Sequence, residues 1–113
     1  MVKLFVYGEL MKGKKVHHKL GQNPKLLCTG HTQKKFVYRR RRLHEICPCT
    51  TKSDYQKGCH LKGEVYDVDL PTLAVVDELE IGSTNGAYDR VKIKYIGDNG
   101  TVGYAYIYQT AKK

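Results

Sequence analysis

RVKIKYIGDNGTVGYAYIYQ, residues 90–109, contains two alternating runs joined by a turn. In the first run apolar residues alternate with lysines, so Val91, Ile93 and Tyr95 are expected to point inward. Asn99-Gly100 is a strong signal for a tight hairpin turn. The returning run, 101–109, places Val and Tyr on one face and Gly, Ala and Ile on the other. One bulky and one small face suit a tightly curved sheet, so this hairpin predicts a small barrel.

The tyrosines of the returning run, at positions 104, 106 and 108, have two interpretations. Tyrosines on one face of a strand usually pack against their cross-strand neighbours. The alternative is that they line a ligand cavity. Packing is the preferred interpretation, with the cavity kept open.

The segment before the hairpin predicts a strand, a short helix and a polar loop. Residues 64–69 alternate as a strand does, and Pro71 marks the start of a helix because proline is favoured in the first helical turn. Residues 81–86, IGSTNG, have no periodicity and contain residues suited to positive φ. The helix is therefore expected to end near Glu80.

Glu80 is the first candidate for a catalytic residue. It would lie at the negative end of the helix dipole, next to Asp77 and Glu78, and both effects favour a raised carboxyl pKa. A carboxylate with a raised pKa can exchange protons near neutral pH. The alternative is an ordinary solvated glutamate on the surface.

The chain opens with a β-favouring run at residues 3–7, which predicts a central strand. Residues 8–13 then form a loop in which Gly8 lets backbone N–H groups face a ligand. The other assignments are a weak helix, two strands and a mostly irregular segment, at residues 14–21, 26–29 with 35–38, and 39–62. The predicted fold is α+β, a small mixed β-barrel with two short helices, in a single domain of residues 1–113.

Charge is unevenly distributed along the chain. Residues 1–62 hold 15 Lys+Arg against 3 Asp+Glu, a net +12, while residues 63–113 hold 5 against 8, a net −3. The basic half could face nucleic acid or anionic small molecules, or could serve solubility or a lysine-rich, thermophile-like composition. Since no apolar run reaches membrane length and no leader is visible, a cytoplasmic protein without a membrane partner is expected.

The cysteines and neighbouring histidines suggest a metal site only weakly. Three cysteines and two histidines have the spacing H-x-x-C-x-C-x9-C-H, and a one-residue gap between cysteines strains tetrahedral zinc coordination. Free thiols are preferred over zinc, and a disulfide from Cys47 or Cys49 to Cys59 is a further alternative. No metal and no organic cofactor is expected.

Three stretches together resemble the γ-glutamylcyclotransferase-like family, which includes AIG2-like proteins and γ-glutamylamine cyclotransferases. They are LFVYGELMKG (4–13), similar to the family's opening strand and loop, KGEVYDVD (62–69), and VVDELE (75–80) followed by AYDRV (87–91). Each motif is weak alone, but the three in this order are specific. The resemblance covers both ends of the chain.

The resemblance implies an enzyme that cyclises a γ-glutamyl amine or γ-glutamyl amino acid to 5-oxoproline and releases the amine. Glu80 occupies the position of the family's acid/base glutamate. The substrate-binding residues implied are Tyr7, Gly8, Glu9, Leu10, Tyr88 and Arg90. For Arg90, an anchoring role in the loop after Glu80 is the alternative to carboxylate binding.

Two departures from the family pattern, at Glu9 and at residues 39–59, leave the function open. Glu9 stands where the family usually has Thr or Ser, so a family member without activity is one alternative. A second alternative function is a nucleic-acid-binding barrel that presents Lys34, Lys35 and Arg39 to Arg42 with Phe36 and Tyr38. Residues 39–59 lack the family's usual apolar middle, which leaves the identity of the γ-glutamyl substrate open.

Overall fold

The computed structural model of the chain describes residues 1–8, 10–21, 23–40, 44–82 and 84–111. Two of its elements are single turns, the 3₁₀ turn η1 and the π-helical turn η2. In chain order the elements are β1 (Val2–Val6), η1 (His17–Leu20), β2 (Lys25–Arg40), β3 (His44–Pro48), α1 (Lys52–Lys57), β4 (Cys59–Val68), α2 (Leu70–Asp77), η2 (Glu78–Gly82), β5 (Tyr88–Gly97) and β6 (Val102–Thr110).

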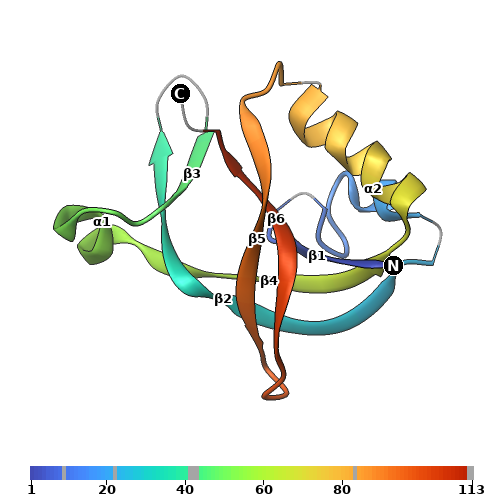
Figure 1. Cartoon of the computed structure of the whole chain (residues 1–113), viewed down its shortest axis with the longest axis horizontal. Helices are drawn as coiled ribbons and strands as arrows, with labels where there is room; N and C mark the ends of the chain where they lie inside the picture. Colours follow the sequence, from blue (N-terminus) through green and yellow to red (C-terminus); the bar gives the residue numbers. More distant parts are fainter. Residues whose placement is uncertain (9, 22, 41–43, 83, 112–113) are drawn as a thin grey trace.

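Five strands close into a mixed barrel in the order β2–β4–β1–β6–β5, and β5 pairs back onto β2. The first and last strands, β1 and β6, are parallel neighbours, and the other pairs are antiparallel. In Figure 1 the β5–β6 hairpin crosses the layer formed by β1, β4 and β2. At the β2–β5 seam, a Cβ on Gly30 would lie 2.4 Å from the Ile96 carbonyl oxygen, so the two backbones meet at a glycine. The predicted small mixed barrel is confirmed.

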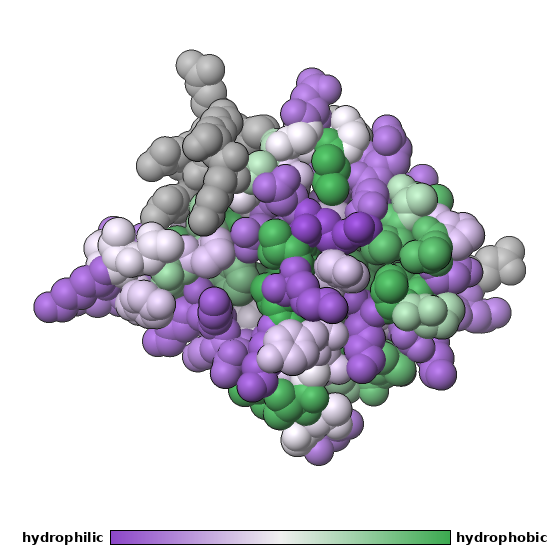
Figure 2. Space-filling view, in the orientation of Figure 1, coloured by the Kyte–Doolittle hydropathy of each residue, from purple (hydrophilic) through white to green (hydrophobic). Residues whose placement is uncertain are grey.

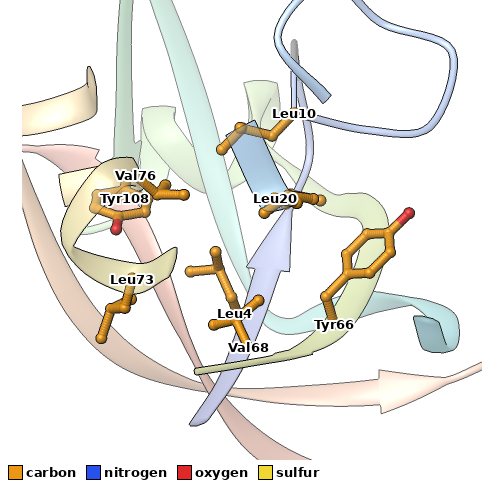
Figure 3. Packing of buried hydrophobic residues seen from close by; sticks show 9 residues of the cluster. Leu4, Leu10, Leu20, Tyr66, Val68, Leu73, Val76 and Tyr108 are labelled. Carbon is orange, nitrogen blue, oxygen red and sulfur yellow. The ribbon is translucent and has the colours of Figure 1, made fainter. Parts of the chain in front are cut away.

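The two faces of the strands bury two different hydrophobic clusters. The helix-side cluster lies beneath α2 and η1, and Figure 3 shows its side chains converging from β1, β4, α2 and β6. It contains Leu4, Val6, Leu10, Leu20, Tyr66, Val68, Leu73, Val76 and Tyr108. The barrel-interior cluster contains Phe5, Phe36, Ile46, Val65, Tyr95, Ala105 and Ile107. Along β6, Ala105 and Ile107 face the interior while Tyr108 joins the helix-side cluster, which is the period of two expected of a strand. The small face predicted for this strand is therefore the inner face of the barrel.

Helix α2 begins and ends close to the predicted positions. The Asp69 carboxylate caps it by accepting a hydrogen bond from the Thr72 amide at 2.8 Å, and Pro71 lies in the first turn. Leu73 and Val76 pack onto the barrel (Figure 3). The backbone then continues as the π turn η2, so helical structure ends just beyond Glu80.

The prediction of a mostly irregular segment at residues 39–62 is wrong. β2 runs without a break from Lys25 to Arg40, β3 pairs back onto it, and α1 and the start of β4 fill most of the remainder. α1 has a capping box: Thr51 Oγ1 accepts from the Asp54 amide at 3.0 Å, and the Asp54 carboxylate accepts from the Thr51 amide at 3.4 Å. The many polar residues in this segment belong to a hairpin and a cap, which obscured the strand pattern. Two bulges in β2 allow the strand to bend along the barrel.

The surface of the described residues is mainly polar. Figure 2 shows mostly hydrophilic side chains over one face of the molecule. Within the described part of the chain, every helix is too short or too polar to cross a membrane. The four cysteines are free thiols.

Candidate functional site

A cavity of about 620 Å³ opens at the end of β1. Its volume is within the range that holds a drug-sized ligand. The residues that line it come from β1 and the following loop, the β2–β3 hairpin, β4, η2, β5 and β6: Phe5, Val6, Tyr7, Gly8, Leu10, Tyr38, Ile46, Leu61, Glu80, Tyr88 and Tyr108. The cavity therefore brings together residues from both ends of the sequence.

Glu80 lines this cavity from the π turn. A π turn inserts one extra residue per turn and redirects the side chains that follow the α-helix. The Glu80 carbonyl accepts a hydrogen bond from Thr84 Oγ1 at 2.7 Å, and the Ile81 carbonyl accepts from the Gly86 amide at 2.9 Å, so the turn is tied to the loop after it. The Glu80 side chain is half-buried.

Burial raises the pKa of the Glu80 carboxyl. The direction agrees with the prediction, and its main cause is burial, which the sequence did not predict. Asp77 is paired with the Arg90 guanidinium and accepts a hydrogen bond from the Tyr108 hydroxyl, and Glu78 is exposed to solvent. The cavity wall itself therefore holds Glu80 toward its protonated form.

Asp77 and Arg90 form an ion pair just behind the cavity. An Arg90 guanidinium nitrogen donates to Asp77 Oδ2 at 2.6 Å, and the Tyr108 hydroxyl donates to Asp77 Oδ1 at 2.6 Å. The guanidinium also lies over the Tyr106 ring, 4.9 Å from its centroid. These contacts join the end of α2 to β5 and β6. Arg90 is absent from the cavity lining, so its contacts match the anchoring alternative.

Removing the Tyr108 hydroxyl is expected to weaken this joint. Tyr108→Phe deletes a hydrogen bond to a carboxylate and should lower the free energy of unfolding by about 2 kcal/mol. Chemical denaturation followed by circular dichroism measures the change, with Tyr104→Phe as the matched control because Tyr104 lies on the same strand and is exposed. Equal stability of the two variants would show that the Tyr108 hydroxyl does not hold the helix end.

Tyr7 joins the first strand to the last one at the cavity. Its hydroxyl donates to the Tyr108 carbonyl oxygen at 2.5 Å. Burial first, and then the nearby Glu80 and Tyr88, raise the pKa of Tyr7 above its ordinary value. Tyr7 is consequently a neutral hydrogen-bonding group at physiological pH, and it lines the same cavity as Glu80 and Tyr88.

The loop after β1 is held from beneath by a buried carboxylate. Glu64 Oε1 accepts from the Lys12 amide at 2.7 Å and from the Tyr66 hydroxyl at 3.0 Å. The Leu10 carbonyl oxygen lies 2.8 Å from His17 Nδ1. Gly8 and Leu10 are therefore fixed where they line the cavity.

The structure brings together most of the residues predicted for the site. Tyr7, Gly8, Leu10, Glu80 and Tyr88 all line one cavity. The predicted Glu9 lies outside the described residues. Sequence reasoning missed the walls formed by Phe5, Val6, Tyr38, Ile46 and Leu61, and for Tyr108 it named a cavity wall only as the second interpretation.

The proposed nucleic-acid face is contradicted at one of its two aromatic residues, Phe36. Phe36 is buried in the barrel-interior cluster and cannot stack on a base, and Tyr38 lines the cavity. The side chains of Arg39 to Arg42 lie outside the described part of the structure. Among the described residues, no three or more His, Cys, Asp or Glu side chains are grouped so that they could hold a metal ion.

Comparisons with known proteins agree with this architecture. The family described as "Gamma-glutamyl cyclotransferase, AIG2-like" matches residues 4–113. The chain is 34% identical over 105 residues to "Putative gamma-glutamylcyclotransferase MJ1514" of Methanocaldococcus jannaschii, covering 93% of this chain and 81% of that protein.

Two solved structures are similar over the whole chain. An AIG2-like protein of Mus musculus is 25% identical with a TM-score of 0.73, and the match covers 100% of this chain and 79% of that one. An uncharacterized protein of Pyrococcus horikoshii, PH0828, is 27% identical with a TM-score of 0.68, and the match covers 100% of this chain and 80% of that one.

Proposed function

The chain belongs to the gamma-glutamyl cyclotransferase, AIG2-like family, and from that premise we propose that it cyclises a γ-glutamyl amine or γ-glutamyl amino acid. In this reaction the α-amine nitrogen of the glutamyl group attacks its own γ-amide carbonyl carbon. The new C–N bond closes 5-oxoproline, and the original amide C–N bond breaks to release the amine. Atoms balance without water, oxidant or reductant.

Glu80 serves as the general base and then as the general acid. An α-ammonium group is a poor nucleophile, so its proton must be removed before attack, and the departing nitrogen must then gain one. One carboxyl group with a raised pKa can accept the first proton and return it to the leaving nitrogen. The half-buried Glu80 carboxyl in the cavity wall is the single observation that carries this proposal.

The loop after β1 is suited to hold the glutamyl group and the developing oxyanion. Nucleophile and electrophile belong to one molecule, so the enzyme chiefly has to hold a bent conformer. The backbone N–H groups of Gly8 and Leu10 are the proposed donors to the oxyanion, since contacts to Glu64 and His17 hold this loop in place. Tyr7 and Tyr88 complete the wall around the glutamyl group. Arg90 positions the helix end through Asp77 without contacting substrate.

The pH dependence of 5-oxoproline release tests the proposal. Glu80 must be ionised to accept a proton, so kcat/KM should fall as the pH falls through its pKa. Because burial raises that pKa, the acid limb should lie above the ordinary glutamate value of about 4.3. A panel of γ-glutamyl amides and amino acids, assayed for 5-oxoproline between pH 4 and 9, measures this limb.

The control for this profile is circular dichroism at each pH, which separates titration of the site from unfolding. An acid limb in the ordinary glutamate range would contradict the buried base. Absence of 5-oxoproline from every compound would favour the alternative of a family member without catalytic activity.

A further inference from the structure

The cavity extends beyond what the glutamyl group requires and spans both hydrophobic clusters. Val6, Leu10 and Tyr108 belong to the helix-side cluster near Glu80, whereas Phe5 and Ile46 belong to the barrel-interior cluster, with Leu61 packed against it. The lining therefore has two parts. We name the second, formed by Phe5, Tyr38, Ile46 and Leu61, the hairpin wall.

The hairpin wall is held in place by the end of the last strand. Tyr38 on β2 and Ile46 on β3 are directly opposite each other in the antiparallel pair. The Ile46 amide donates to Thr110 Oγ1 at 2.9 Å, which ties β3 to β6, and Figure 1 shows the two strands adjacent. Ile46 is buried while Tyr38 is 52% exposed, so Tyr38 forms the rim of the cavity and Ile46 its inner surface.

The chemistry of this wall is apolar and aromatic. Among the described residues that line the cavity, Glu80 is the one residue of the Asp, Glu, Lys, Arg and His types. A leaving amine that carried a carboxylate would bring that charge against Phe5, Ile46 and Leu61 without a described cation to pair with it, which is unfavourable. An apolar amine would instead bury its surface there and could stack on the Tyr38 ring.

Resting on the proposed function, we propose that the hairpin wall is the leaving-group subsite and selects uncharged aromatic or branched aliphatic amines. The glutamyl group occupies the part of the cavity next to Glu80 and the β1 loop. The amine side of the scissile bond then points toward β2 and β3. Tyr38 acts as a specificity-determining residue and takes no part in proton transfer.

The test compares three substrates on the purified protein: γ-glutamylbenzylamide, γ-glutamylalanine and ε-(γ-glutamyl)lysine. The expected result is a kcat/KM for the benzylamide at least tenfold above the other two, which is the scale on which an apolar pocket discriminates. Tyr38→Ala should lower the benzylamide value several-fold, mainly through a higher KM, and should lower the γ-glutamylalanine value by a smaller factor. Tyr38→Arg should improve γ-glutamylalanine relative to the benzylamide by supplying a cation at the rim.

The matched control is Tyr104→Ala, because Tyr104 is 59% exposed and does not line the cavity. It should leave all three substrates unchanged. A preference for γ-glutamylalanine or the lysine derivative, or an equal effect of Tyr38→Ala on all three substrates, would overturn the apolar subsite while cyclisation stands. A preference for γ-glutamylalanine would point to the arginines at 39–42 as carboxylate ligands. Absence of 5-oxoproline from all three compounds would overturn the proposed function and this subsite with it.

Discussion

Replacing Glu80 with glutamine is expected to lower kcat/KM for 5-oxoproline release by about 10³-fold, the scale of a lost general acid/base. Glutamine keeps the shape of the side chain but cannot accept the α-ammonium proton. Residual turnover should lose the acid limb of the pH profile. Steady-state assays across pH measure both effects.

The unfolding midpoint of Glu80→Gln shows whether this variant keeps its fold. Because burial raises the pKa of Glu80 in the folded state, the stability that its neutral form contributes is present below the unfolded-state pKa and is lost as the pH rises through the folded-state pKa. At pH 7.5 the neutral glutamine should therefore leave the unfolding midpoint equal to or above that of the parent.

The matched control is Glu78→Gln, which changes an exposed carboxylate in the same π turn. It should retain full activity. Retained turnover in Glu80→Gln would remove Glu80 from the mechanism, and a loss in Glu78→Gln of the same size would show that the turn is sensitive to any charge change.

Gly63→Ala is expected to lower the free energy of unfolding by about 3 kcal/mol, more than Tyr108→Phe. Overpacked positions next to rigid backbone relax poorly. A Cβ at Gly63 would lie 2.2 Å from the Val6 carbonyl oxygen and 2.8 Å from the Phe5 ring. To accommodate it, β4 would have to move away from β1. The midpoint of urea unfolding measures the effect.

Lys62→Ala is the control for this prediction, because the neighbouring side chain is exposed and its removal creates no clash. Its unfolding midpoint should stay close to that of the parent. An unchanged midpoint for Gly63→Ala would mean that β1 and β4 can separate locally at little cost.

The parts of the fold that follow from local pattern were predictable. Residues 91–95 alternate because one face packs into the barrel and the other meets solvent, and Asn99-Gly100 favours the hairpin on its own. The helix after Asp69 was marked by Pro71 in the same way. Closure of β2 onto β5 leaves no such local signal, because it joins residues far apart in the sequence.

The β2–β3 hairpin was missed because its stability comes from its neighbours. Pro48 and a run of arginines are unfavourable in a strand, yet β3 pairs at the edge of the sheet, where proline is tolerated. One local signal was available, since Thr51 followed three residues later by Asp54 is a capping box and predicts the start of α1.

For the site, the sequence predicted the direction of the Glu80 pKa shift but not its main cause, which is burial in the cavity. Asp77 follows the helix pattern, so its charge was expected to act on Glu80. Only the tertiary structure brings Arg90 and Tyr108 against Asp77. It also forms the cavity that buries Glu80. The catalytic role of Glu80 stays a prediction, as do the cytoplasmic location and the single-domain organisation.

The parallel contact between β1 and β6 has a consequence for biosynthesis. Among the strands of this sheet, β1 leaves the ribosome before the others, but its neighbour β6 is translated after them. A nascent chain therefore exposes one unpaired edge of β1 until residues 102–110 emerge, and pairing over such a sequence distance is slow. Since Tyr7 also requires the Tyr108 carbonyl, the cavity assembles only after β6 has been synthesised.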